Sequence, residues 1–100
     1  MPLKIVRTGT WLYDGAVDRP VDIIAFEYDW WYSLAAKDGL LDDNEQPTPL
    51  GPDGCLYYVR FQLALDPSEP TWVDSAGYQQ LSDAMAVAQE KVVGKIHWLR

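Results

Sequence analysis

The sequence has very little cysteine and histidine. Because Cys55 is the only cysteine, an intramolecular disulfide and a metal site built from several thiolates are both excluded. His97 and Cys55 are the one possible pair of base and thiol nucleophile, and both lie in segments with a strand pattern rather than on an exposing turn. No third residue is indicated that would orient the imidazole. The sequence therefore predicts neither a thiol-dependent catalytic site nor a bound cofactor.

Long hydrophobic runs and phosphate-binding loops are also missing. No apolar stretch approaches the roughly 20 residues that span a bilayer, and no apolar signal-peptide region follows Met1. The glycines form neither G-x-G-x-x-G nor G-x-x-x-x-G-K-S/T, and H-E-x-x-H and G-x-S-x-G are absent. We expect a soluble, cytoplasmic protein that does not bind membranes.

Basic residues are few. Eight lysines and arginines stand against 15 acidic residues, which gives a formal net charge of −7. Ten of the acids lie between Asp14 and Asp53, where only Arg19 and Lys37 are basic. Nucleic-acid backbones are bound by clustered lysine and arginine, so we expect no nucleic-acid partner, whereas an acidic region attracts a basic protein. The alternative is that these acids only keep the surface solvated.

What the sequence does have is apolar and aromatic residues, at 48% and 13% of the chain. With 100 residues, this content predicts a single domain, 1–100, with a buried core. Residues 3–13 have the pattern of a first strand, and Asp14-Gly15 favours a type I′ hairpin turn. Arg19-Pro20 leaves two possibilities open, because a proline indicates either a bulge in the returning strand or a strand that begins at Val21.

A period of two runs through residues 21–34 and predicts a second strand. One face carries Ile24, Phe26, Tyr28, Trp30, Tyr32 and Leu34, and the other carries Val21, Ile23, Ala25, Glu27, Asp29, Trp31 and Ser33. Residues 55–65 predict a third strand, whose odd-numbered face we expect to meet the aromatic face of the second strand across the core. Trp31 beside Glu27 and Asp29, and Tyr58 beside Arg60, have the composition of an interface hot spot. Alternatively, Val21, Ile23, Ala25 and Trp31 are covered and form a second core layer.

The remaining segments complete the predicted fold. Residues 35–54 form a long acidic loop rich in proline and glycine, with one helical turn considered around 34–41. A short fourth strand is expected at 71–74, and a closing strand at 95–99. Between them Leu81, Ala84, Met85, Ala88 and Val92 share one stripe of a helix at about 80–93. The prediction is an α+β domain: a mainly antiparallel sheet of four to five strands with one C-terminal helix packed on one face.

The C-terminal stretch around Trp72, Gly77-Tyr78, Leu81, Ala84 and Ala88 resembles a strand-turn-helix pattern of small bacterial and phage proteins. This resemblance covers less than a third of the chain and implies no activity. We therefore expect a non-enzymatic protein-interaction module of the inhibitor or immunity type. It would bind a basic protein or form a homodimer through an edge strand. The predicted interaction surface comprises Glu27, Asp29, Trp31, Asp42, Asp43, Glu45 and Tyr58.

The alternative function is a small-ligand-dependent or metal-dependent enzyme that uses Glu27, Asp29 and the loop carboxylates. Two carboxylates two residues apart on one strand face would lie roughly 7 Å from each other, a separation that paired-carboxylate hydrolases use. The segment that starts at Asp42 has part of the oxygen-ligand spacing of a calcium-binding loop. However, Pro47 stands where the sharp turn of that loop requires glycine. We therefore predict no metal site.

Overall fold

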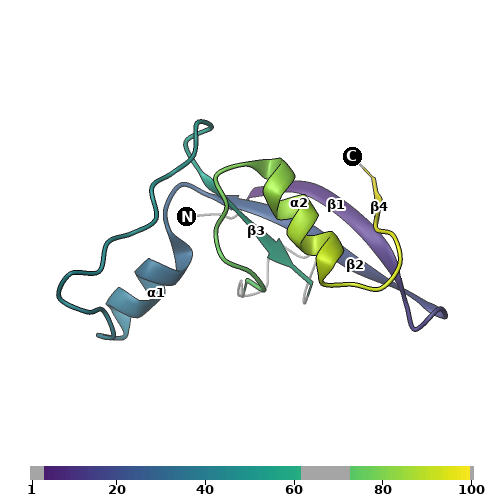
Figure 1. Ribbon diagram of the computed structural model, residues 1–100, viewed down its shortest axis with the longest axis horizontal. Coiled ribbons are helices and arrows are strands. Elements are labelled where there is room, and N and C mark those ends of the chain that lie inside the picture. Colours follow the sequence, from purple (N-terminus) through teal and green to yellow (C-terminus); the bar gives the residue numbers. More distant parts are fainter. Residues whose placement is uncertain (1–3, 62–72, 100) are drawn as a thin grey trace.

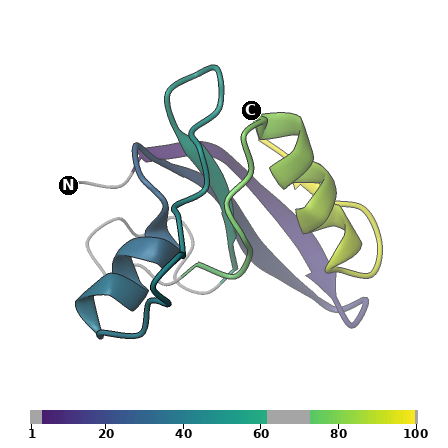
Figure 2. The ribbon, with the colours of Figure 1, turned by 60° about the vertical axis from the view of Figure 1, so that its left-hand side comes forward.

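The computed structural model describes residues 4–61 and 73–99 as a four-stranded sheet with two helices (Figure 1). The strands are β1 (Lys4–Tyr13), β2 (Val17–Phe26), β3 (Leu56–Arg60) and β4 (His97–Trp98), and the helices are α1 (Trp30–Lys37) and α2 (Leu81–Glu90). The strand order is β3-β2-β1-β4, and each neighbouring pair is antiparallel. Helix α2 covers one face of the sheet, whereas α1 stands at one end (Figure 2). The predicted α+β fold with a C-terminal helix on one face is confirmed.

The β1–β2 hairpin turns where the sequence predicts. Asp14 and Gly15 have φ values of 53° and 65°, as the two central residues of a type I′ turn require. The Ala16 amide donates to the Tyr13 carbonyl at 3.0 Å. Neither possibility raised for Pro20 holds, because β2 runs through Pro20 in register with Thr10. Among the described residues Pro20 has a neighbouring strand on one side only, and such an edge position tolerates proline.

The core consists of two apolar clusters, one on each face of the sheet. The cluster under α2 contains Val21, Ile23, Ala25, Tyr57, Val59, Ala84, Ala88 and Ile96. The cluster on the opposite face contains Ile24, Phe26, Leu56, Tyr58 and Val73. Ile23 pairs with Val59 in the sheet, so the odd-numbered residues of both strands lie on the same face. The expectation that the odd face of the third strand meets the aromatic face of the second is wrong. The covered-face alternative is right for Val21, Ile23 and Ala25.

The predicted second strand is wrong beyond Phe26, because the chain turns there into α1. Asp29 is the N-cap of this helix, and its Oδ1 accepts a hydrogen bond from the Tyr32 amide at 3.1 Å. At the other end Gly39 has a φ of 70°, and the Gly39 and Leu40 amides donate to the Ala36 and Ala35 carbonyls. These two bonds form a Schellman motif. The N-cap at Asp29 and the left-handed Gly39 therefore favour a helix over the strand that the period of two predicts.

The C-terminal half follows the predicted order with shorter elements. Helix α2 spans Leu81–Glu90 within the predicted range 80–93, and β4 lies within the predicted strand 95–99. Residues 62–65 of the predicted third strand and 71–72 of the predicted fourth lie outside the described residues. Val73 and Asp74 belong to no named strand. The Asp74 amide nevertheless donates to the Val59 carbonyl at 2.8 Å, and the Val59 amide donates to Ser75 Oγ at 2.9 Å.

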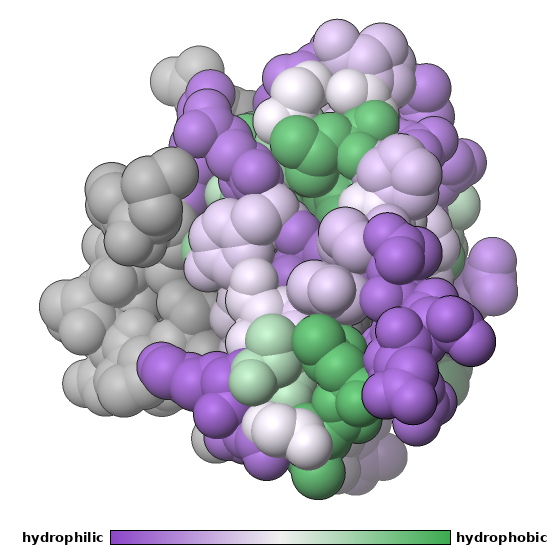
Figure 3. Space-filling view, turned by 90° about the vertical axis from the view of Figure 1, so that its left-hand side faces the viewer, coloured by the Kyte–Doolittle hydropathy of each residue, from purple (hydrophilic) through white to green (hydrophobic). Residues whose placement is uncertain are grey.

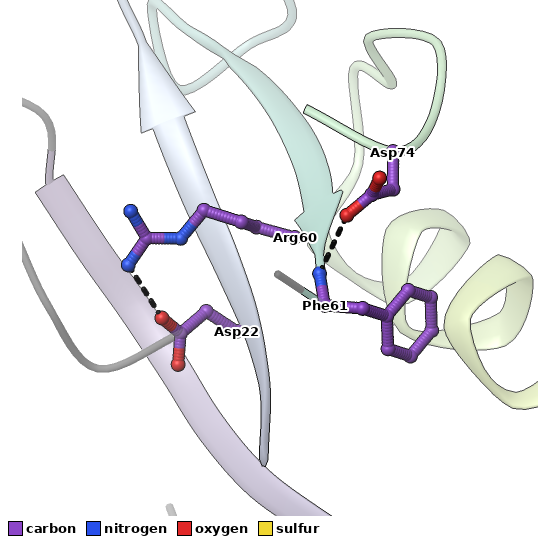
Figure 4. Close-up of polar contacts among 4 residues, drawn as sticks. All are labelled: Asp22, Arg60, Phe61 and Asp74. Atoms are coloured by element: carbon purple, nitrogen blue, oxygen red, sulfur yellow. Dashed lines mark hydrogen bonds and ion pairs between the residues drawn. The ribbon is translucent and has the colours of Figure 1, made fainter. Parts of the chain in front are cut away.

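A buried ion pair joins β2 to β3. Arg60 Nη2 lies 2.8 Å from Asp22 Oδ2, and both side chains are fully buried (Figure 4). The two residues are directly opposite each other in the register of the sheet. Figure 4 also shows the Asp74 carboxylate, which accepts a hydrogen bond from the Phe61 amide at 2.7 Å. A buried charge requires its partner, so this pair fixes how β2 and β3 align.

Candidate functional site

Helix α1 is attached to the rest of the protein by polar contacts and by Trp30, which packs half-buried against the apolar cluster opposite α2; none of its eight residues is fully buried. Asp29 Oδ2 accepts a hydrogen bond from the Thr48 amide at 2.8 Å, so one carboxylate joins α1 to the following loop. The Trp31 indole Nε1 donates to the Ser75 carbonyl at 2.8 Å. The Trp30 amide donates to the Tyr58 hydroxyl, also at 2.8 Å. The helix is therefore fixed in position, and Trp31 on it stays exposed.

Tyr58 does not lie on a surface. Its side chain is fully buried in the cluster opposite α2, so the expected exposure beside Arg60 is wrong. Burial raises the pKa of Tyr58 to about 12, with a smaller contribution from the nearby Asp29 carboxylate and an opposing one from the hydrogen bond of the Trp30 amide. The sequence pattern failed here because Arg60, taken as a sign of a solvated face, is itself buried against Asp22.

The other predicted surface residues belong to one end of the molecule, residues 27–54, which we call the α1 end. Trp31 is 38% exposed, and Glu27, Asp42, Asp43 and Glu45 are exposed. Asp29 is half-buried in its capping role. The α1 end has seven acidic residues and a single basic one, Lys37. Viewed from this side, apolar areas lie among strongly hydrophilic ones (Figure 3).

The α1 end also contains surface features that sequence reasoning missed. A hollow of about 380 Å³ lies between α1 and the loop, and its lining includes Tyr28, Tyr32, Pro47, Pro49 and Leu50. Leu50 is 40% exposed, and Leu40 beside the helix is 71% exposed. The sequence did not predict this hollow, because the period of two assigned residues 30–34 to a strand. The signals that would have revealed it are the cap at Asp29 and the glycine at position 39.

The structure does not bring together the residues of the alternative enzymatic function. Glu27 and Asp29 share no strand face, because β2 ends at Phe26, and the Asp29 carboxylate is occupied by two backbone amides. Within residues 4–61 and 73–99, no group of three or more histidine, cysteine, aspartate or glutamate residues is arranged to hold a metal ion. His97 is on β4 and Cys55 directly precedes β3, at opposite edges of the sheet. They cannot act as a catalytic pair in this fold.

Comparisons with known proteins find no counterpart for this arrangement. No family model matches the chain, and no curated protein or solved structure matches it. Neither helix in the described part of the chain is long and apolar enough to cross a membrane.

Proposed function

We propose that this protein is a non-enzymatic interaction module, of the inhibitor or immunity type, that binds a basic protein partner in the cytoplasm through its α1 end. The observation that carries the proposal is the exposed side chain of Trp31 on α1, with the half-buried Trp30 and Tyr32 beside it in the helix. Large apolar side chains are normally buried in a protein's own core. A large side chain that stays exposed, as Trp31 does, is typical of a surface that a partner covers.

The local structure supports a preformed binding surface. Trp31 keeps 38% of its area exposed while its indole nitrogen is hydrogen-bonded to the Ser75 carbonyl. Asp29 fixes both the start of α1 and the loop near Thr48. A side chain that is already held loses little conformational entropy when it binds. Tryptophan is also among the residues that contribute most to binding energy at interfaces.

Charge supports a basic partner. Seven acidic residues against one basic residue at the α1 end produce a negative potential around the exposed aromatic and leucine side chains. Such a potential accelerates association with a positively charged surface and weakens as salt concentration rises.

Self-association through an edge strand receives less support. The outer edge of β3 is covered by the segment 73–78, which hydrogen-bonds to Tyr57 and Val59. Strand β4 pairs with β1 only at Gly9 and Thr10, and the register of β1 is interrupted between Ile5 and Arg7. Bulges and charged residues at an exposed edge discourage pairing with a second copy. We therefore favour a different, basic protein as the partner.

Capture by immobilised protein from lysate of the source cells tests this proposal. We expect the wild type to retain a basic protein at low salt, and Trp31→Ala to weaken that capture by about tenfold or more, as expected for a hot-spot residue. The double variant Asp42→Asn, Asp43→Asn should reduce capture more strongly at low salt than at high salt.

The matched controls lie on the hairpin, at the opposite end of the molecule from α1 (Figure 1). Tyr13→Ala removes an aromatic side chain that is 49% exposed, and Asp14→Asn with Asp18→Asn removes two exposed charges. Capture that survives Trp31→Ala, or that falls equally in the hairpin variants, would refute the α1 end as the binding surface. Circular dichroism of each variant confirms that the fold is retained.

A further inference from the structure

A cavity of about 390 Å³ lies where the α1 end meets the sheet, on the face of the sheet that α2 covers. Lys4, Ala25 and Tyr57 are neighbours in register across three strands, and all three line it. Ala25 and Tyr57 belong to the apolar cluster under α2, which places the cavity on that face. This volume falls in the range of roughly 300 to 1,000 Å³ that is common for small-ligand sites.

The cavity has an apolar floor and a charged rim. Ala25 and Tyr57 are 8% and 7% exposed and form the floor with the half-buried Val6. The exposed residues Lys4, Glu27 and Asp53 stand around it. Two carboxylates and one ammonium therefore leave the rim with an excess negative charge.

One of the two carboxylates is held in place over the floor. The Tyr57 hydroxyl donates a hydrogen bond to Asp53 Oδ2 at 2.7 Å. This bond, together with burial, raises the pKa of Tyr57 well above its ordinary value, so the phenol remains a donor at physiological pH. Among the described residues neither Glu27 nor Asp53 forms an ion pair. Both carboxylates are therefore available to an incoming cation.

We propose that this cavity receives a lysine or arginine side chain of the basic partner, an inference that rests on the proposed function. Such a side chain combines an apolar stem with a charged head. The stem fits over Ala25 and Tyr57, and the head reaches the carboxylates of Glu27 and Asp53, where charge-assisted hydrogen bonds form. Lys4 on the same rim is a cation that competes with the incoming head. An anionic ligand would meet two like charges and is disfavoured.

The test is a titration of ¹⁵N-labelled full-length protein with N-acetyl-L-arginine amide, followed by the amide resonances. We expect saturable shifts centred on Gly54, Cys55 and Tyr57, with a dissociation constant on the order of millimolar for so small a probe. The neutral isostere N-acetyl-L-citrulline amide should cause no saturable shift there. Glu27→Gln and Asp53→Asn should each weaken binding about threefold or more, and Lys4→Gln should strengthen it.

Two controls make the same changes of charge outside the cavity. Asp43→Asn and Lys37→Gln should leave the affinity within about twofold, because exposed charges at a distance are screened. Equal binding of the arginine and citrulline probes, or equal effects of the control variants, would overturn the inference. Arginine-probe shifts confined to other residues would also overturn it.

This test separates the inference from the proposed function. If Trp31→Ala abolishes capture of the basic partner while the arginine probe produces no shift at Gly54 or Tyr57, only the cavity inference fails. If the arginine probe binds in the cavity while capture does not change in Trp31→Ala, the proposed binding surface around Trp31 fails and the cation site stands.

Discussion

Asp22 and Arg60 face each other across β2 and β3 with 2.8 Å between Oδ2 and Nη2, and both side chains are fully buried. Transferring two charges from water into a protein interior carries a large desolvation penalty, which the mutual attraction offsets only while both partners are present. The pair contributes more to the register of the two strands than a pair of apolar residues would, because any shift would separate the charges.

Asp22→Asn should therefore destabilise the fold by about 3 to 5 kcal/mol, since it removes the carboxylate charge that compensates a buried guanidinium. Urea-induced unfolding at neutral pH measures this change in the free energy of unfolding. Asp18→Asn, at an exposed position on the same strand, should change it by no more than about 0.5 kcal/mol. A loss below about 1 kcal/mol for Asp22→Asn would show that the pair does not hold the sheet together.

Tyr58 makes the free energy of unfolding depend on pH in the alkaline range. Its pKa is raised to about 12 in the folded protein, mainly by burial, whereas an unfolded chain has a tyrosine pKa near 10. Between these values the unfolded state loses the phenolic proton and the folded state keeps it, so stability falls as pH rises, by up to about 1.4 kcal/mol per pH unit.

Urea titrations at several pH values between about 9 and 12 should show this fall in the wild type, and a shallower one in Tyr58→Phe. The raised pKa of Tyr57 acts in the same direction, so the slope in the variant should not vanish. Identical slopes for the two proteins would contradict the assignment to Tyr58.

The elements differ in how clearly the sequence defines them. The β1–β2 hairpin and α2 are predictable because Asp14-Gly15 and the stripe from Leu81 to Val92 are local signals that tertiary contacts do not oppose. Helix α1 is different, because Tyr28, Trp30 and Tyr32 fit a strand while Trp31, Leu34 and Ala35 fit a helical spacing equally well. The choice is made by Asp29, whose carboxylate also binds the amide of Thr48, a residue that is distant in the sequence.

Asp29→Ala should loosen α1 and its loop without unfolding the sheet. Loss of an N-cap typically costs about 1 to 2 kcal/mol, so amide exchange in α1 and around Thr48 should become about tenfold faster or more, while β1 and β2 amides stay unchanged. Asp43→Ala, which removes an exposed loop carboxylate, is the matched control. Faster exchange throughout the sheet would mean that α1 is required for the global fold rather than attached to it.

The whole molecule is polarised in charge, with seven acidic residues and one basic residue at the α1 end. It extends 47 Å along its longest axis, with α1 toward one end and the hairpin tip at the other (Figure 1). Charge counting located the acidic region, and the period of two in residues 21–34 singled out Trp31. It could not show that Tyr58 is buried, or that Tyr32 and Pro49 line one hollow, because both depend on segments that only the tertiary structure brings together.

Hydrogen exchange of the protein alone and bound to the basic partner it captures tests the role of the α1 end most directly. We expect binding to slow exchange over residues 28–50, and the hairpin around Asp14 and Gly15 to exchange as in the free protein. Slower exchange at the hairpin or along α2, with residues 28–50 unchanged, would contradict this expectation.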